Sequence, residues 1–269
     1  CLSFAAAKDY RVTVASTDVD RSVQVVSFTM PDDAPRAAIL RGTSAALPLQ
    51  VAADGTATFI IDTQKAGQTL TYTLTAATGA AAKTREAVSV TRDPQRVKVA
   101  IGGAPVFDYQ MDKEALPRPD IKPEYKRAGY LHPIYTPSGK VVSDDFPPQH
   151  IHHHGIWSPW TKTSFQGRTP DFWNMGGKTG TVEFVALDRT WSGAVHGGFV
   201  ARHKFVDLSA KPAPMVALHE TWEVTAYHAP AAARVFDLML TQTCATNDPL
   251  ILPKYHYGGL GFRARGEWY

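Results

Sequence analysis

The 269-residue chain lacks several features that would assign it to common protein classes. It has no run of about 18 apolar residues, so no segment is expected to span a membrane. Its 28 Lys and Arg residues nearly balance 25 Asp and Glu residues and form no cluster, whereas nucleic-acid-binding proteins usually show a basic stripe. A Gly-rich phosphate loop, a Cys-x-x-Cys pair and a nucleophile elbow are all missing. These absences exclude nucleotide-binding and zinc-finger interpretations and argue against a nucleic-acid partner.

Cysteine is scarce, with only Cys1 and Cys244 in the chain. Residues 1–7 are typical of the end of an apolar signal region followed by an Ala-x-Ala cleavage site. We therefore expect a signal-peptide remnant there and a periplasmic or extracellular protein; a lipid-modified Cys1 or an ordinary N-terminus are the alternatives. If Cys1 is removed, no disulfide can form within the chain, and Cys244 is expected to be a small buried side chain.

Residues 8–93 are expected to form a small β-domain because apolar and polar side chains alternate along them. In residues 69–75, Leu70, Tyr72 and Leu74 share one face and threonines occupy the other. Residues 47–61 contain two β-like runs around Asp54-Gly55, which is a strong hairpin signal. Further strands are expected at residues 22–30 and 86–91. About five to seven short strands in this length predict a sandwich of immunoglobulin type.

The next domain is expected at residues 94–269, after a boundary at Arg92-Asp93-Pro94-Gln95. A hairpin is expected around Gly102-Gly103, and prolines make residues 113–126 an ordered loop rather than a helix. Further strands are expected at residues 181–187, 199–206, 218–226, 235–243 and 259–265. The pattern predicts a larger β-sandwich with long loops, so the whole chain is expected to be all-β.

All ten histidines and all six tryptophans lie at or after His132. Histidine suits proton transfer and metal binding near neutral pH, and tryptophan offers a flat face that suits a sugar ring. This uneven distribution places the expected active or binding site in the second domain.

The densest group of these residues is the histidine-rich segment 150–154. If it is extended, His150, His152 and His154 lie on one face and His153 on the other. Two such imidazoles could bind a divalent metal, or they could supply an acid and a hydrogen-bond donor to a polar ligand. Close imidazoles disfavour each other's protonation, so neutral rings are expected. A solvated surface loop is the alternative.

Other candidates lie farther along the chain. His196 lies between glycines that allow close approach of a ligand, and His256 is flanked by aromatic residues. On the strand expected at 218–226, His219 and Glu220 face opposite sides, and Trp222 shares the face of Glu220; His219 is therefore the better candidate. The residues expected to bind a ligand are Trp157, Trp160, Lys162, Asp171, Trp173, Tyr255 and His219.

Several motifs together resemble the bacterial family labelled PmoA, or methane oxygenase PmoA. They are Tyr130-Leu131-His132-Pro133, Ser143-Asp144-Asp145-Phe146-Pro147-Pro148, His150-x-His152-His153-x-Gly155-Ile156-Trp157, Asp171-Phe172-Trp173 and Tyr257-Gly258-Gly259-Leu260-Gly261. The resemblance covers about residues 95–269. Many members have Asp-His-Pro-His-His-Arg-Gly at the histidine segment, where this chain has Gln149, Ile151 and His154 in the Asp, Pro and Arg positions.

The resemblance implies a carbohydrate-related role, because members of this family are associated with bacterial sugar catabolism. It also implies a second domain similar to the galactose-mutarotase-like β-sandwich, in which a histidine and a carboxylate act on a sugar. Methane oxidation is not expected, because methane monooxygenase subunits span the membrane several times. Members usually continue beyond the last residue of this sequence, so the domain is expected to be truncated and a catalytic carboxylate could lie outside it.

Three hypotheses follow. The first is an epimerase, lyase or hydrolase that acts on a small carbohydrate, with His150, His152, His256 and His196 as catalytic candidates. The second is a metal-dependent enzyme with His150, His152 and His154 as ligands of a divalent metal. The third is a non-catalytic carbohydrate-binding module.

Overall fold

The computed structural model describes residues 9–42, 46–77, 87–112, 114, 116–230 and 232–268. The expected signal-peptide remnant, residues 1–7, lies outside the described residues, as does Glu86 in an expected strand. The chain forms two compact units: Cys1–Ser89 with Ser192–Gly197 and Tyr227–Val235, and Val90–Trp191 with Gly198–Ala226 and Phe236–Tyr269. The first unit therefore ends its N-terminal part at Ser89, four residues before the boundary expected at residue 93. It also includes Ser192–Gly197 and Tyr227–Val235, which the sequence places in the second domain.

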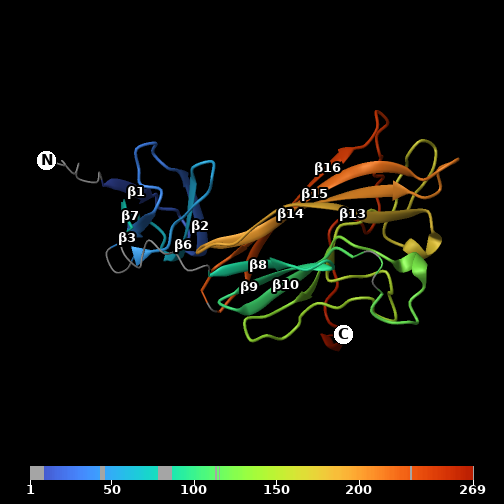
Figure 1. Ribbon diagram of the computed structural model, residues 1–269, viewed down its shortest axis with the longest axis horizontal. Helices are drawn as coiled ribbons and strands as arrows, with labels where there is room; N and C mark the ends of the chain where they lie inside the picture. Colours follow the sequence, from blue (N-terminus) through green and yellow to red (C-terminus); the bar gives the residue numbers. More distant parts are fainter. Residues whose placement is uncertain are drawn as a thin grey trace. The chain divides into compact units, whose positions relative to one another are not determined.

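The prediction of an all-β protein is confirmed, since nearly all of the regular secondary structure consists of antiparallel sheets (Figure 1). The helical segments are short 3-10 turns: η2 (Pro123–Tyr125), η3 (Met175–Gly177) and η4 (Gly266–Trp268). No helix among the described residues is long and apolar enough to cross a membrane.

The first unit contains two sheets, in the strand orders β1-β7-β3-β4 and β2-β6-β5. Their strands are β1 (Tyr10–Val14), β2 (Arg21–Thr29), β3 (Ala38–Arg41), β4 (Ala46–Leu47), β5 (Gln50–Val51), β6 (Thr56–Gln64) and β7 (Leu70–Ala76). Both sheets contribute to one core, in which Leu40, Phe59 and Leu74 are fully buried. The expected hairpin at Asp54-Gly55 joins β5 to β6, and Asp54 accepts the backbone N–H of Thr56.

The segment Ser192–Gly197 belongs to the first unit through specific hydrogen bonds. The side-chain oxygen of Gln50 accepts the backbone N–H groups of Val195 and His196 at 2.9 and 3.0 Å. Its amide group donates to the carbonyl of His196, and Val88 pairs with Gly193 as an antiparallel bridge. Because these contacts join residues about 100 or more positions apart, local sequence pattern gives no sign of them.

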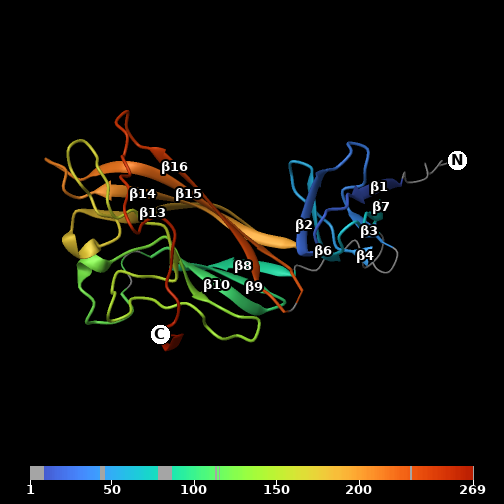
Figure 2. The same ribbon diagram turned by 180° about the vertical axis from the view of Figure 1, so that it is seen from behind.

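Two further sheets belong mainly to the second unit: a six-stranded sheet in the order β17-β12-β11-β10-β9-β8 and a four-stranded sheet in the order β13-β14-β15-β16 (Figure 2). One end of each of β8, β14, β15 and β16 is assigned to the first unit. The strands are β8 (Val88–Arg92), β9 (Arg96–Ile101), β10 (Ala104–Gln110), β11 (Tyr130–Ile134), β12 (Ile156–Trp157), β13 (Gly180–Trp191), β14 (His196–Asp207), β15 (Met215–Tyr227), β16 (Val235–Cys244) and β17 (Gly261–Phe262). The strand expected at 259–265 is therefore reduced to two residues.

Aromatic side chains join the two sheets of this unit into a sandwich. Tyr109 of β10 contacts Phe199 of β14 with ring centroids 4.6 Å apart, and Phe107 contacts Phe236 of β16 at 5.1 Å. Trp222 of β15 is fully buried beside Tyr109, which confirms that the face it shares with Glu220 is the core face. Cys244, which was expected to be buried, is exposed at the end of edge strand β16.

Candidate functional site

The histidine-rich segment consists of two consecutive turns. The backbone N–H of His150 donates to the carbonyl of Pro147 at 2.9 Å, and that of His153 donates to the carbonyl of His150 at 2.8 Å. The condition that this segment is extended is therefore not met, because Pro147 and Pro148 lack N–H groups for a strand and proline favours the second position of a turn. The segment ends at Gly155, where a Cβ atom would lie only 2.1 Å from the carbonyl oxygen of Leu131.

The turns bring together a different set of imidazoles from the one that strand alternation predicts. His150 and His153 stack with ring centroids 4.7 Å apart and planes 16° apart. His152 meets His153 edge-on at 4.6 Å and lies 6.2 Å from His150. His154, which alternation had placed beside His150 and His152, is instead fully buried.

Aromatic rings continue this group from His153 to the C-terminal segment. Trp173 lies 5.7 Å from His153, and its indole N–H donates to His153 Nε2 at 3.4 Å. Tyr257 lies 5.2 Å from Trp173 and 5.1 Å from Tyr255, both measured between ring centroids. We define the histidine–aromatic cluster as His150, His152, His153, Trp157, Trp173, Tyr255, His256 and Tyr257.

Polar groups border the cluster. Asp171 accepts hydrogen bonds from the backbone N–H groups of Trp173 and Asn174 and from the Asn174 amide, each at 2.8 Å. The same amide group donates to the Tyr257 hydroxyl at 3.2 Å. Lys162 Nζ lies 5.8 Å from the centre of the Tyr255 ring. Asn174 and Tyr257 were not predicted as site residues, although each adjoins a residue that was.

The imidazoles of His152 and His153 are neutral near pH 7, because the pKa of each is lowered. Burial is the main cause that lowers the pKa of His153 to about 3, and the neighbouring His152, His150 and Arg263 lower it further. Burial and His150 also lower the pKa of His152, while Asp171 acts in the opposite direction. The prediction of neutral rings is therefore confirmed for these two residues.

The predicted metal site is not assembled. His154 is turned away from His150 and His152, and its Nδ1 lies 2.6 Å from Asp145 Oδ1. Across the part of the chain that the structure describes, no three His, Cys, Asp or Glu residues are arranged to hold a metal ion. The metal-binding hypothesis for His150, His152 and His154 therefore lacks its donor set.

Three further predicted residues are not members of the cluster. His196 belongs to the first unit, where its backbone binds Gln50. His219 is exposed on β15 and makes no ring contact with the cluster among the described residues. Trp160 packs against the hydrophobic core and donates its indole N–H to Gln242 at 2.9 Å.

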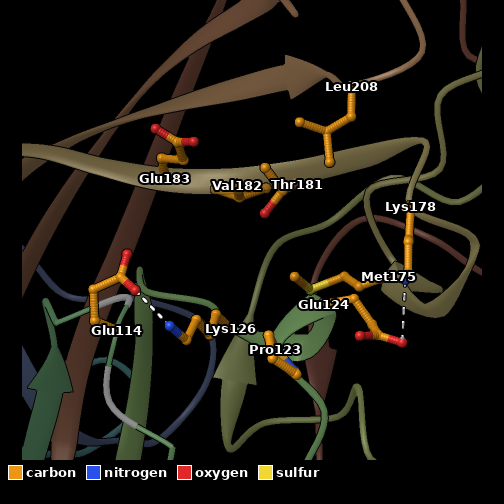
Figure 3. Close-up of a pocket in the computed structure, with 10 residues that line it drawn as sticks. All are labelled: Glu114, Pro123, Glu124, Lys126, Met175, Lys178, Thr181, Val182, Glu183 and Leu208. Atoms are coloured by element: carbon orange, nitrogen blue, oxygen red, sulfur yellow. Dashed lines mark hydrogen bonds and ion pairs between the residues drawn. The ribbon is translucent and has the colours of Figure 1, made fainter.

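The second unit also contains a cavity of about 410 Å³, which is lined by none of the cluster residues (Figure 3). Its apolar wall includes Met175, Val182 and Leu208, and its rim carries ion pairs. Lys126 pairs with Glu114 at 2.6 Å, and Lys178 approaches Glu124 to 3.8 Å. Since each of these lysines already has a carboxylate beside it, the cavity offers less to a polar ligand than the cluster does.

The fold and the cluster together define an all-β protein with a candidate binding site of histidine and aromatic side chains. Residues 96–269 match the model of the family DUF6807, which is described as a family of unknown function, and the chain belongs to that family. The match contains the whole cluster. No curated protein and no solved structure matches the chain.

Proposed function

We propose that the histidine–aromatic cluster binds a carbohydrate outside the cytoplasm and performs acid–base chemistry on it. The observation that carries this proposal is the grouping of His150, His152 and His153 next to a row of aromatic rings. Exposed aromatic faces suit sugar rings, and Tyr255 and Tyr257 are 44% and 38% exposed. The resemblance to the PmoA-labelled family, whose members are associated with sugar catabolism, also supports a carbohydrate ligand.

Within this proposal His152 is the better general base of the two cluster histidines whose pKa values are lowered. A base must be neutral at the working pH and still bind a proton well, so its pKa should lie near that pH. The pKa of His153 is about 3, too low for an effective base, whereas the nearby carboxylate of Asp171 favours protonated His152. His153 then serves to hold the rings of His150 and His152 and to contact Trp173.

Tyr257 is the matching candidate for a general acid. Its oxygen accepts a hydrogen bond from the Asn174 amide, and its hydroxyl is also hydrogen-bonded with Tyr255. A ligand that takes the place of Tyr255 in this contact would receive the Tyr257 proton. A neutral base and a phenol suit epimerisation, elimination or hydrolysis at a sugar carbon.

The test is calorimetric binding and product analysis with a panel of neutral and acidic mono- and oligosaccharides. We expect His152→Ala and Tyr257→Phe to abolish product formation, with His219→Ala as the matched control on an exposed histidine outside the cluster. Binding without product in the wild-type protein would indicate a carbohydrate-binding module. The proposal fails if no saccharide binds, or if His219→Ala impairs binding as strongly as His152→Ala.

A further inference from the structure

His150, His152 and His153 of the cluster lie on a loop, residues 146–153, whose two ends meet. The backbone N–H of Phe146 donates to the carbonyl of His153 at 3.0 Å. Immediately outside this contact, His154 Nδ1 and Asp145 Oδ1 lie 2.6 Å apart. One backbone hydrogen bond and one side-chain hydrogen bond therefore close the loop at its neck.

The side-chain contact at the neck is fixed by the core on several sides. Tyr130 of β11 donates its hydroxyl proton to the other oxygen of Asp145 at 3.1 Å, and its ring stacks on His154 at 4.3 Å. The Phe146 ring meets His154 edge-on at 4.6 Å. Because His154 is fully buried, it cannot reach a ligand itself.

The backbone at the neck is also under strain. Phe146 has a φ of 47°, a left-handed conformation that a bulky side chain rarely adopts. Its carbonyl accepts a hydrogen bond from Arg118 at 2.9 Å. Strained conformations of this kind persist only where surrounding contacts hold them, and they are concentrated at functional sites.

The charge state of the neck is set by burial. Burial raises the pKa of Asp145 to about 7, and it lowers the pKa of His154 well below its ordinary value. A His–Asp contact alone would move both values in the opposite directions, so burial outweighs the mutual attraction. The other charged or titratable groups that act on the pair are His132, Asp144, Tyr130, Arg127 and His152.

We propose that Asp145 and His154 are positioning residues, whose hydrogen bond clasps the neck of loop 146–153 and holds His150, His152 and His153 together. The importance of these two residues for a carbohydrate site rests on the proposed function. The closure of the loop is independent of that function. The clasp can therefore be tested on the protein without a ligand.

The first experiment compares Asp145→Ala with Asp145→Asn by amide hydrogen exchange. Asp145→Ala removes the clasp, and we expect the amides of Phe146 and His153 to exchange about tenfold faster or more, because a hydrogen bond to a charged or strongly polar group is lost. Asn can accept from His154 and hydrogen-bond with the Tyr130 hydroxyl, so Asp145→Asn should restore most of the protection.

Two controls separate the clasp from general destabilisation. Asp144→Asn removes the charge of the adjacent carboxyl group but keeps a side-chain oxygen that can accept the Asp145 backbone N–H, as Asp144 does at 2.8 Å, and should leave the exchange of the loop amides unchanged. The amides of Val182 and Phe205 in the core should also be unchanged in Asp145→Ala. If that variant does not fold, Tyr130→Phe keeps the stacked ring and removes only one hydrogen bond to Asp145, and should accelerate loop exchange a few-fold.

A second readout is the pKa of the loop imidazoles measured by NMR. In Asp145→Ala the rings should separate and become solvated, so the pKa values of His152 and His153 should rise toward the ordinary value of about 6.5. Unchanged loop exchange and unchanged pKa values in both Asp145→Ala and Tyr130→Phe would overturn the clasp. If the wild-type protein binds no saccharide but the loop responds as expected, the proposed function fails and the clasp stands.

Discussion

Replacing Glu220 tests how strongly a buried polar network stabilises the second unit. His203 Nδ1 lies 3.1 Å from Glu220 Oε2, and the two side chains are 0% and 1% exposed. The Gln242 amide donates to the other carboxylate oxygen at 2.8 Å, and the Tyr109 hydroxyl is hydrogen-bonded to His203 Nε2. A carboxylate only accepts hydrogen bonds, so Glu220→Gln turns one of its oxygens into a donor that faces another donor.

The expected loss is measurable for a single substitution. A buried donor that is left without an acceptor costs about 1–3 kcal/mol. For a domain of 150–250 residues this corresponds to a decrease in Tm of roughly 2–12 °C. The free energy of unfolding of a typical domain is only about 5–15 kcal/mol, so the variant should be measured at low temperature.

The same strand provides a matched control for Glu220→Gln. Glu223 lies on the opposite face of β15, where its carboxylate pairs at 3.2 Å with Arg189, a side chain that is 60% exposed. Since exposed pairs contribute about 1 kcal/mol or less, Glu223→Gln should change little. Urea unfolding followed by tryptophan fluorescence suits the measurement, because Trp222 lies 5.4 Å from His203. A loss below about 1 kcal/mol for Glu220→Gln would refute the reasoning.

Three further predictions concern the fold and its response to pH. Gly129→Ala should lower Tm in a thermal melt, because φ is +79° and the new Cβ would lie 2.8 Å from the His203 ring; an unchanged Tm would contradict this. The pKa values of His152 and His153 are lowered in the folded state, so the unfolded state binds more protons below about pH 6.5. The free energy of unfolding in urea should therefore fall as the pH decreases from about 6.5 to 3. The decrease should be less steep in His153→Gln. Leu74→Ala should cost the first unit about 2–5 kcal/mol in urea unfolding, without changing the loop amides of the second unit.

The strands could be predicted from the sequence wherever one face is buried and the other is exposed. In β7, Tyr72 and Leu74 are buried while Thr71 and Thr73 are exposed, as the alternation predicted. The same rule placed Glu220 correctly on the core face of β15. It could not show that His203 and Tyr109, from two other strands, would meet Glu220, because such pairing depends on how the sheets pack.

The unit boundary could not be predicted for a similar reason. The sequence around Pro94 has the composition of a linker, and nothing near His196 suggests that it belongs with the first unit. The decisive contacts are the hydrogen bonds that the side-chain oxygen of Gln50 accepts from the backbone N–H groups of Val195 and His196, which lie 145 and 146 residues away in the chain. One consequence is that His196 cannot be assigned to the cluster on the basis of its flanking glycines.

In the histidine segment, residue spacing alone is not sufficient to predict which side chains lie together. Alternation assigns the four histidines of residues 150–154 to two faces according to whether their residue numbers are even or odd. This assignment is valid only if the backbone is extended. Two prolines favour turns in this segment. As a result His153, and not His154, lies beside His150 and His152. What distinguishes them in the structure is their partners: His153 faces other imidazoles and Trp173, whereas His154 is bound to Asp145. A buried histidine bound to a carboxyl group at the neck of a loop is suited to hold that loop, and the exposed and half-buried histidines on the loop are the ones suited to meet a ligand.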